Sequence, residues 1–191
     1  MKIEECQVFL SAALSGTAIA NPKVSPLGRS AESVLVMARA YESDGRTFFA
    51  AGDPVNALAS FWYGLGWLHF GITCGLLNSP KTAGCPGVEP GESHRPEYRP
   101  QLTEKTARYE RLLDTARCSV ECAPEPATGA HDFAGRVLLI ASVYAMHGTL
   151  MRKTGRDEDA LAAFSYGHGW LDAGVTTGLF RITAHHEIFT V

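Results

Sequence analysis

Two pairs of an acid and a histidine are the side chains of this sequence best suited by type to acid–base chemistry. Asp44 and His69 lie in the first half of the chain, and His147 and Asp172 occupy the corresponding places 103 residues further along. A histidine beside a carboxylate can act as a general acid and base. Asp44 and His69 would lie about 12 Å apart along a helical hairpin, so a direct pair requires contact between the halves, as between His69 and Asp172. We interpret all four as structural polar bridges and predict no catalytic residue.

Metal-ligating types occur at helical spacing without completing a site. His168 and Asp172 are four residues apart and share one helical face, as do Cys118 and Cys122. Two ligands fall short of the three or four protein ligands of a zinc site. The sequence therefore predicts no metal site and no cofactor.

Paired aromatic residues accompany these polar groups. Tyr63 and Trp67 stand four residues apart, and Tyr166 and Trp170 repeat the pair. We interpret them as core anchors. The alternative is a small-ligand pocket between the halves, with the rings as walls and an acid or histidine as its polar group. We call the contact between the two halves the seam. The candidate residues for a ligand site or for this seam are Asp44, Tyr63, Trp67, His69, His147, Tyr166, His168, Trp170 and Asp172.

An internal duplication organises the chain. Tyr41 aligns with Tyr144 without a gap onward, and the identities include Gly45/Gly148, Gly52/Gly155, Ala57/Ala160, Phe61/Phe164, Gly66/Gly169 and Trp67/Trp170. Residues 1–78 therefore form a first repeat and residues 103–191 a second repeat with a C-terminal tail. The segment between them, 79–102, is rich in proline and glycine, a composition typical of a linker.

The apolar spacing within each repeat is helical. It predicts helices near 2–19, 30–51, 54–77, 103–121, 131–154 and 157–181. Gly52 and Gly155 suit helix ends, and Asp53 with Pro54 suits the start of the next helix. We expect an all-α protein whose two three-helix repeats pack as a pseudo-two-fold helical bundle.

Glycines recur along one stripe of each third helix. They are Gly64, Gly71 and Gly75 in the first repeat, and Gly167, Gly174 and Gly178 in the second. A glycine inside a helix costs about 0.5–1 kcal/mol relative to alanine. We therefore expect close helix packing along this stripe, with the two repeats joined through it.

The middle hairpin of each repeat resembles a tetratricopeptide unit. Large, small and turn residues follow one another as Tyr41, Gly45, Phe48, Gly52, Ala57, Phe61 and Gly64, and the second repeat has the same order. The second helix is longer than in that family, and the closing proline is absent. The resemblance implies two closely packed antiparallel helices.

The third helix carries a second resemblance. The segment AAFSYGHGWLDAGVTTGL, with Tyr-x-x-x-Gly and Gly-x-x-x-x-Ala-Leu before it, resembles the archaeal domain of unknown function 357 family. Both repeats share the resemblance, although His69-Phe70 stands in the first where the second has Asp172-Ala173. The resemblance implies a small helical fold and an archaeal origin, and it implies no activity.

Composition limits the classes of partner. The net charge of −3 lacks the basic excess that DNA binding usually requires. Residues 58–77 are apolar and long enough to cross a bilayer, but Asp172 in the matching helix of the second repeat argues against a membrane span. Five cysteines without a C-x-x-C motif indicate a reducing compartment. We therefore expect a cytoplasmic protein that is a monomer mimicking a dimer, or a weak homo-oligomer.

These observations favour a non-enzymatic scaffold or protein-interaction module, with an unknown protein partner or a small ligand at the seam between the repeats. One alternative remains. Arg181 and His186 enclose four residues, which resembles the R-x4-H motif of the HEPN ribonucleases, a group of small helical bundles. That resemblance implies a ribonuclease or an RNA-associated helical protein.

Overall fold

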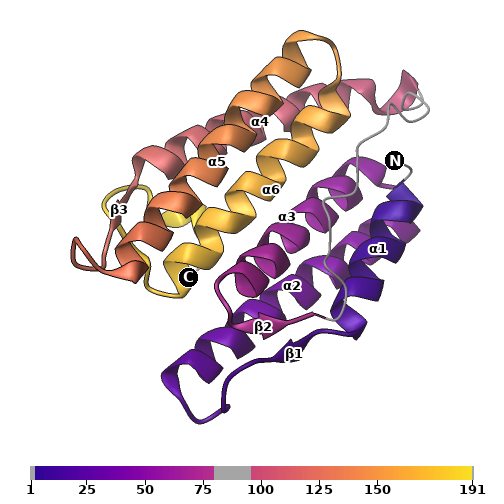
Figure 1. The fold of residues 1–191 in the computed structure, drawn as a ribbon. Helices are drawn as coiled ribbons and strands as arrows, with labels where there is room; N and C mark the ends of the chain where they lie inside the picture. Colours follow the sequence, from indigo (N-terminus) through magenta and orange to yellow (C-terminus); the bar gives the residue numbers. More distant parts are fainter. Residues whose placement is uncertain (1–2, 80–95, 191) are drawn as a thin grey trace.

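Six α-helices in two groups of three form the protein, which a computed structural model describes over residues 3–79 and 96–190. The two groups lie side by side, with α3 and α6 next to each other between them (Figure 1). This arrangement confirms the predicted all-α fold. We call the folded repeats the first and second copies. The first copy contains α1 (Ile3–Ser15), α2 (Pro26–Ala50) and α3 (Pro54–Thr73). The second copy contains α4 (Arg99–Cys118), α5 (Gly129–Lys153) and α6 (Asp157–Thr176). The likeness of the hairpins to tetratricopeptide units stays a prediction.

Local sequence signals set the helix boundaries. The Ser25 side chain caps α2 by accepting a hydrogen bond from the Gly28 amide at 3.0 Å, and Asp53 caps α3 through the Asn56 amide at 3.0 Å. Gly52 and Gly155 have φ values of 77° and 76°, the left-handed conformation that ends a helix at low cost for glycine. Each tight turn therefore joins its two helices into an antiparallel hairpin.

The third helices are shorter than predicted. They end at Thr73 and Thr176, because Gly75 and Gly178 take φ values of 73° and 79° in the turn that follows. A Cβ atom at either glycine would meet nothing within 4 Å. Gly75 and Gly178 are thus turn residues, and the expectation that they pack closely against another helix is corrected.

Each copy is closed by a two-stranded antiparallel sheet that the sequence did not predict. In the first copy β1 (Ala18–Ile19) pairs with β2 (Leu77–Asn78). In the second copy β3 (Val120–Cys122) pairs with β4 (Phe180–Ile182). The first helix was predicted to continue to residue 19, but it ends at Ser15 and the chain turns into β1. Each sheet ties the end of a first helix to the end of a third helix.

The glycine stripe of each third helix faces its own copy. A Cβ atom on Gly64 would stand 3.0 Å from Cβ of Tyr41 in α2, and one on Gly71 would stand 2.6 Å from Leu77 in β2. Gly167 and Gly174 face Leu113 and Phe180 of the second copy in the same way. The expectation that the two copies join through this stripe is therefore wrong. Each third helix is buried on all sides, and it packs against its own copy with the glycine stripe and against the other copy with a different face.

The copies meet at a different pair of glycines. A Cβ atom on Gly66 would lie 2.5 Å from the carbonyl oxygen of Tyr166, and one on Gly169 would lie 2.5 Å from the carbonyl oxygen of Tyr63. The two helix backbones touch where Gly66 meets Gly169, at equivalent positions of the duplicated sequence. An approximate two-fold relation between the copies therefore passes close to this contact.

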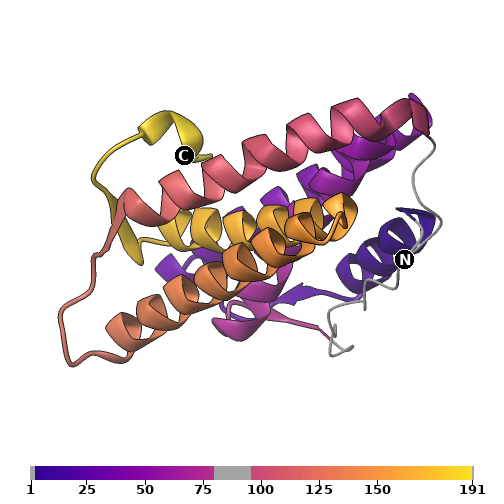
Figure 2. The same ribbon diagram turned by 90° about the horizontal axis from the view of Figure 1, so that it is seen from above.

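The fourth helix begins inside the segment predicted to be a linker. A 3₁₀ turn, η1 (Pro96–Tyr98), leads into α4 at Arg99, and Pro100 fits the first turn of a helix. Most of the predicted linker lies outside the described residues. Figure 2 shows α4 reaching toward the first copy, where Gln101 donates to Asp53 at 3.0 Å and Lys105 donates to Asn56.

Candidate functional site

Asp172 lies in one half of the seam between the copies. It sits on α6, has no exposed surface, and accepts a hydrogen bond from the Tyr63 hydroxyl of α3 at 2.7 Å. Thr190, in the tail after β4, supplies two further donors, its amide at 2.9 Å and its hydroxyl at 2.5 Å. One carboxyl group thus joins the first copy, the second copy and the tail.

Two tyrosines stack beside this carboxyl group. The rings of Tyr41 and Tyr63 have centroids 4.5 Å apart, and the hydroxyls of Tyr41 and Thr190 are 3.4 Å apart. Burial is the largest cause that raises the pKa of Tyr63 well above its ordinary value, and the nearby Asp172 carboxyl is the second. The Tyr63 phenol therefore stays a neutral hydrogen-bond donor at physiological pH and is unsuited to give up a proton in catalysis.

The opposite half of the seam repeats the arrangement with a histidine in place of the acid. Nδ1 of His69, on α3, lies 2.8 Å from the hydroxyl of Tyr166 on α6, and the rings of Tyr166 and Tyr144 are 4.3 Å apart. His69 and Asp172 therefore each pair with a tyrosine of the other copy. The acid–histidine exchange gives each copy one polar bridge to its neighbour.

His168 is a buried histidine at a position that holds Leu65 in the first copy. Its ring lies between Tyr63 and Phe189, with centroid distances of 5.4 Å and 6.3 Å. Burial lowers its pKa below the ordinary 6.5, although the Asp172 carboxyl and the Ile188 backbone act in the opposite direction. The ring is therefore neutral at pH 7 and serves as a packing surface.

We expect His168 to make the protein less stable in mild acid. Below about pH 6.5 the unfolded chain protonates this histidine while the folded chain resists protonation. The unfolded state then binds more protons, so the free energy of unfolding falls as the pH drops, by at most about 1.4 kcal/mol per pH unit for one group. Urea unfolding at several pH values between 7.5 and 5 measures this slope.

His168→Leu is the matched control for that slope, since Leu65 occupies the equivalent position in the first copy. The variant should lose the part of the acid destabilisation that His168 causes, so its unfolding curves should change less with pH. An unchanged pH slope in the variant would show that His168 does not carry the effect.

The remaining predicted seam residues divide into two groups. Trp67 and Trp170 are buried, and Trp170 packs edge-on against Phe70 at 5.8 Å. Asp44 and His147 are exposed on α2 and α5. The structure thus brings the two tryptophans into the core beside the seam and leaves Asp44 and His147 on the outer surface.

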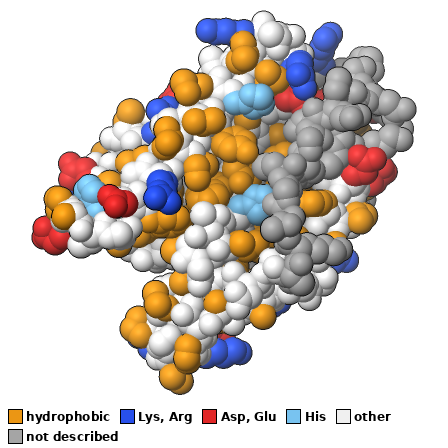
Figure 3. Space-filling view, viewed as in Figure 1, with side chains coloured by type: hydrophobic (Ala, Val, Ile, Leu, Met, Phe, Trp, Pro, Cys, Tyr) orange, Lys and Arg blue, Asp and Glu red, His pale blue; other side chains and the backbone are white. Residues whose placement is uncertain are grey.

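Sequence reasoning missed the outer face of α5. Leu139, Val143, Met146 and Leu150 are 62%, 46%, 65% and 55% exposed, and they fall within a 60° arc because a helix turns about 100° per residue. We call these four residues the α5 row. Figure 3 shows apolar side chains gathered where α5 lies in Figure 1. A signal was present in the sequence: the aligned residues of the first copy are Val36, Ala40, Ser43 and Thr47.

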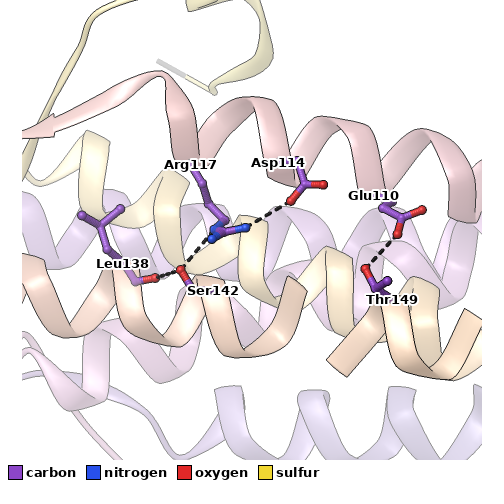
Figure 4. Close-up of polar contacts among 6 residues, drawn as sticks. All are labelled: Glu110, Asp114, Arg117, Leu138, Ser142 and Thr149. Carbon is purple, nitrogen blue, oxygen red and sulfur yellow. Dashed lines mark hydrogen bonds and ion pairs between the residues drawn. The ribbon is translucent and has the colours of Figure 1, made fainter. Parts of the chain in front are cut away.

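A groove of about 270 Å³ runs between α4 and α5 beside this row. Its lining combines Met146, Leu150 and Ala145 with Asp114, Arg117, Thr149 and Lys153. Figure 4 shows how its walls are held: Arg117 bonds Ser142 and Asp114, each at 3.1 Å, and Glu110 accepts from Thr149 at 2.8 Å. The polar wall is therefore fixed by hydrogen bonds while the apolar wall stays open.

The exposed apolar face gives α5 an unusual composition for a surface helix. Of the helices in residues 3–79 and 96–190, α5 alone is long and apolar enough to cross a membrane. In its most apolar stretch of 18 residues, 28% is buried. Length and composition are weak evidence for a membrane span, because the core helix of a soluble protein meets the same criteria.

Other chemical candidates are dispersed. In the described part of the chain no three His, Cys, Asp or Glu side chains gather as a metal site would require. Arg181 lies in β4 and forms an ion pair with Glu121 at 2.8 Å, and His186 begins the exposed turn η2 (His186–Ile188). Their arrangement as a ribonuclease pair stays untested.

The comparisons with known proteins agree with the internal duplication. A family model described as "Protein of unknown function (DUF357)" matches residues 8–77 and, a second time, residues 108–180. No curated protein and no solved structure matches the chain.

Proposed function

Because the chain belongs to the DUF357 family and carries its unit twice, we propose that it is a docking module. The second copy binds an amphipathic helix of a partner protein along α5 and performs no catalysis. The observation that carries this proposal is the α5 row, four large apolar side chains that face solvent on one side of a single helix. Apolar surface of this kind marks interaction sites on soluble proteins.

The groove beside the α5 row favours a helix of a protein partner over the flat surface of a membrane. A helix that lies along α5 can insert side chains into the space between α4 and α5, with anchors at positions i, i+4, i+7 and i+11. A bilayer surface would leave this groove unfilled. The spacing of Leu139, Val143, Met146 and Leu150 thus sets the spacing expected in the partner.

Charge specifies the partner further. Arg136 and Lys153 extend the α5 row at its two ends, about 26 Å apart at 1.5 Å per residue. Both are exposed, and in the described residues neither forms an ion pair, even though Asp132 lies one turn before Arg136. A partner helix with acidic residues near both ends would meet these two cations.

A second copy of this chain fits this face poorly. If two α5 helices paired in antiparallel fashion about the middle of the row, Arg136 of one copy would approach Lys153 of the other. In parallel pairing each cation would face its own counterpart. Like charges set opposite each other disfavour association, so we propose a different protein as the partner.

Two synthetic peptides test this proposal. Each is a fluorescein-labelled helix of about 20 residues with leucines at i, i+4, i+7 and i+11, and the ends carry glutamates in one peptide and lysines in the other. We expect the glutamate peptide to bind the full-length protein at least tenfold more tightly in fluorescence anisotropy, about 1.4 kcal/mol. The difference should shrink as salt is added, because exposed charges are screened.

Two surface variants locate the binding. Met146→Asp places a charge in the middle of the α5 row and should abolish peptide binding without changing the melting curve. Val36→Asp alters the exposed position of α2 that aligns with Leu139 and should bind like the wild type. Equal affinity for both peptides would contradict the proposal, as would equal loss in both variants. Binding to anionic phosphatidylglycerol vesicles that Met146→Asp abolishes, without peptide binding, would replace the protein partner by a membrane.

A further inference from the structure

The carboxyl group of Asp172 has no exposed surface. In residues 3–79 and 96–190 no lysine or arginine forms an ion pair with it. The Tyr63 hydroxyl and the amide and hydroxyl of Thr190 donate hydrogen bonds to it. Removing such a charge from water costs several kcal/mol when no opposite charge accompanies it.

Two of the three hydrogen bonds come from a short tail segment. Thr183 donates its amide to the carbonyl of Ser119 at 2.8 Å, and after it the described tail makes no further backbone–backbone hydrogen bond to the body of the second copy. Residues 183–187 are exposed, and Phe189 is buried against His168. Ile188, Phe189 and Thr190 thus hold this part of the tail against α6. A segment held by few buried contacts opens at low free-energy cost.

The groups beneath the tail match the chemistry of an organic cation. The stacked rings of Tyr41 and Tyr63 adjoin the carboxyl group, and the ring of His168 on α6 continues the aromatic wall. Aromatic faces attract ammonium groups, most strongly where water is excluded. A carboxylate in the same site adds a charge-assisted hydrogen bond.

We propose that Asp172, with Tyr41 and Tyr63, binds a primary alkylammonium group that takes the place of Thr190. The ammonium N–H groups replace the two donors of Thr190 and supply the positive charge that the site lacks. A free amine and a lysine side chain share this chemistry. The tail occupies the site in the absence of ligand, so it weakens binding by the free energy needed to displace it.

Thr190→Pro tests the competition between tail and ligand in the full-length chain. Proline removes both the amide donor and the hydroxyl donor. The preceding residue, Phe189, has φ −106° and ψ 148°, a conformation that residues before proline favour. We expect n-butylammonium to bind this variant at least tenfold more tightly than the wild type in calorimetric titration. Thr190→Val, which keeps the amide donor, should show a smaller gain.

The neutral analogue n-butanol separates charge recognition from apolar binding. We expect n-butanol to bind at least tenfold more weakly than n-butylammonium, and Asp172→Asn in the Thr190→Pro background to abolish the difference. Nα-acetyl-lysine methylamide is the second probe. If it binds and butylammonium does not, the ligand is a lysine side chain, and the reverse result identifies a free amine.

Nuclear magnetic resonance keeps the test decisive if Asp172→Asn fails to fold. In the wild type, butylammonium should shift the signals of the Thr190 amide and the Tyr63 ring and speed hydrogen exchange at Thr190, while Tyr144, in the opposite half of the seam, should not respond. Equal affinity for butanol and butylammonium would overturn the proposal. So would the absence of any gain in Thr190→Pro, or equal responses at Tyr63 and Tyr144.

Discussion

Gly66→Ala is expected to lower the free energy of unfolding by about 3 kcal/mol, at the upper end of the usual cost of overpacking. The new methyl group would lie 2.5 Å from the carbonyl oxygen of Tyr166 and 3.2 Å from Cα of Gly169. Both atoms belong to the backbone of α6, which cannot move aside as a side chain can. The two central helices must separate, and their whole interface loosens. A fall of roughly 10 °C in melting temperature should accompany the loss.

Gly135→Ala is the control for this substitution. Gly135 also lies inside a helix, α5, but a Cβ atom there would meet nothing within 4 Å. Alanine is favoured over glycine in a helix interior by about 0.5–1 kcal/mol, so this variant should be slightly stabilised. Two variants with equal melting temperatures would show that α3 and α6 do not touch at Gly66.

The first copy, expressed alone as residues 1–79, is expected not to form a stable monomer. In the full chain Trp62 and Phe70 of α3 pack against Tyr166 and Trp170 of the second copy, with ring centroids 6.2 Å and 5.8 Å apart. Without α6 this side of α3 is exposed. Domains below about 80 residues rarely gain more than 3–5 kcal/mol from their core, and without α6 the fragment loses one of the two largest packing contacts of α3.

Analytical ultracentrifugation and thermal unfolding of the fragment measure this dependence. We expect either an unfolded chain or a homodimer in which Gly66 meets Gly66 of the second fragment, as Gly66 meets Gly169 in the full chain. Gly66→Leu should then dissociate the homodimer. A monomeric fragment with a sharp, cooperative melting transition would contradict the expectation that the copies depend on each other.

The duplication and the helical fold could be predicted from the sequence because both depend on local signals. The repeated order of glycine and aromatic residues needs no tertiary information to recognise. Gly52, Asp53 and Pro54 end one helix and begin the next through their own backbone preferences and hydrogen bonds. The same local reasoning placed the ends of α3 and α6 too late, because Gly75 and Gly178 were assigned to packing and in fact form turns.

The side chains of the candidate site could be predicted only in part. Tyr63, His69, Tyr166 and Asp172 were selected by type and by their equivalent places in the repeats, and the structure gathers them at the seam. Their pairing could not be predicted, because a hydrogen bond between copies depends on how α3 and α6 cross. The approach of Thr190 to Asp172 depends on the path of the tail, for which the sequence carries no periodic signal.

The two helical copies, and the polar residues at matching positions of their central helices, follow from the repeated pattern of the sequence. The face of each central helix that meets the other copy depends on the packed structure, because α3 and α6 are apolar or small on nearly every side and their periodicity gives no direction. For the same reason the sequence could not separate the buried side of α5 from its open side. Whether an apolar side chain is covered depends on the neighbouring helix, and α5 has α6 on one side and solvent along Leu139 to Leu150 on the other.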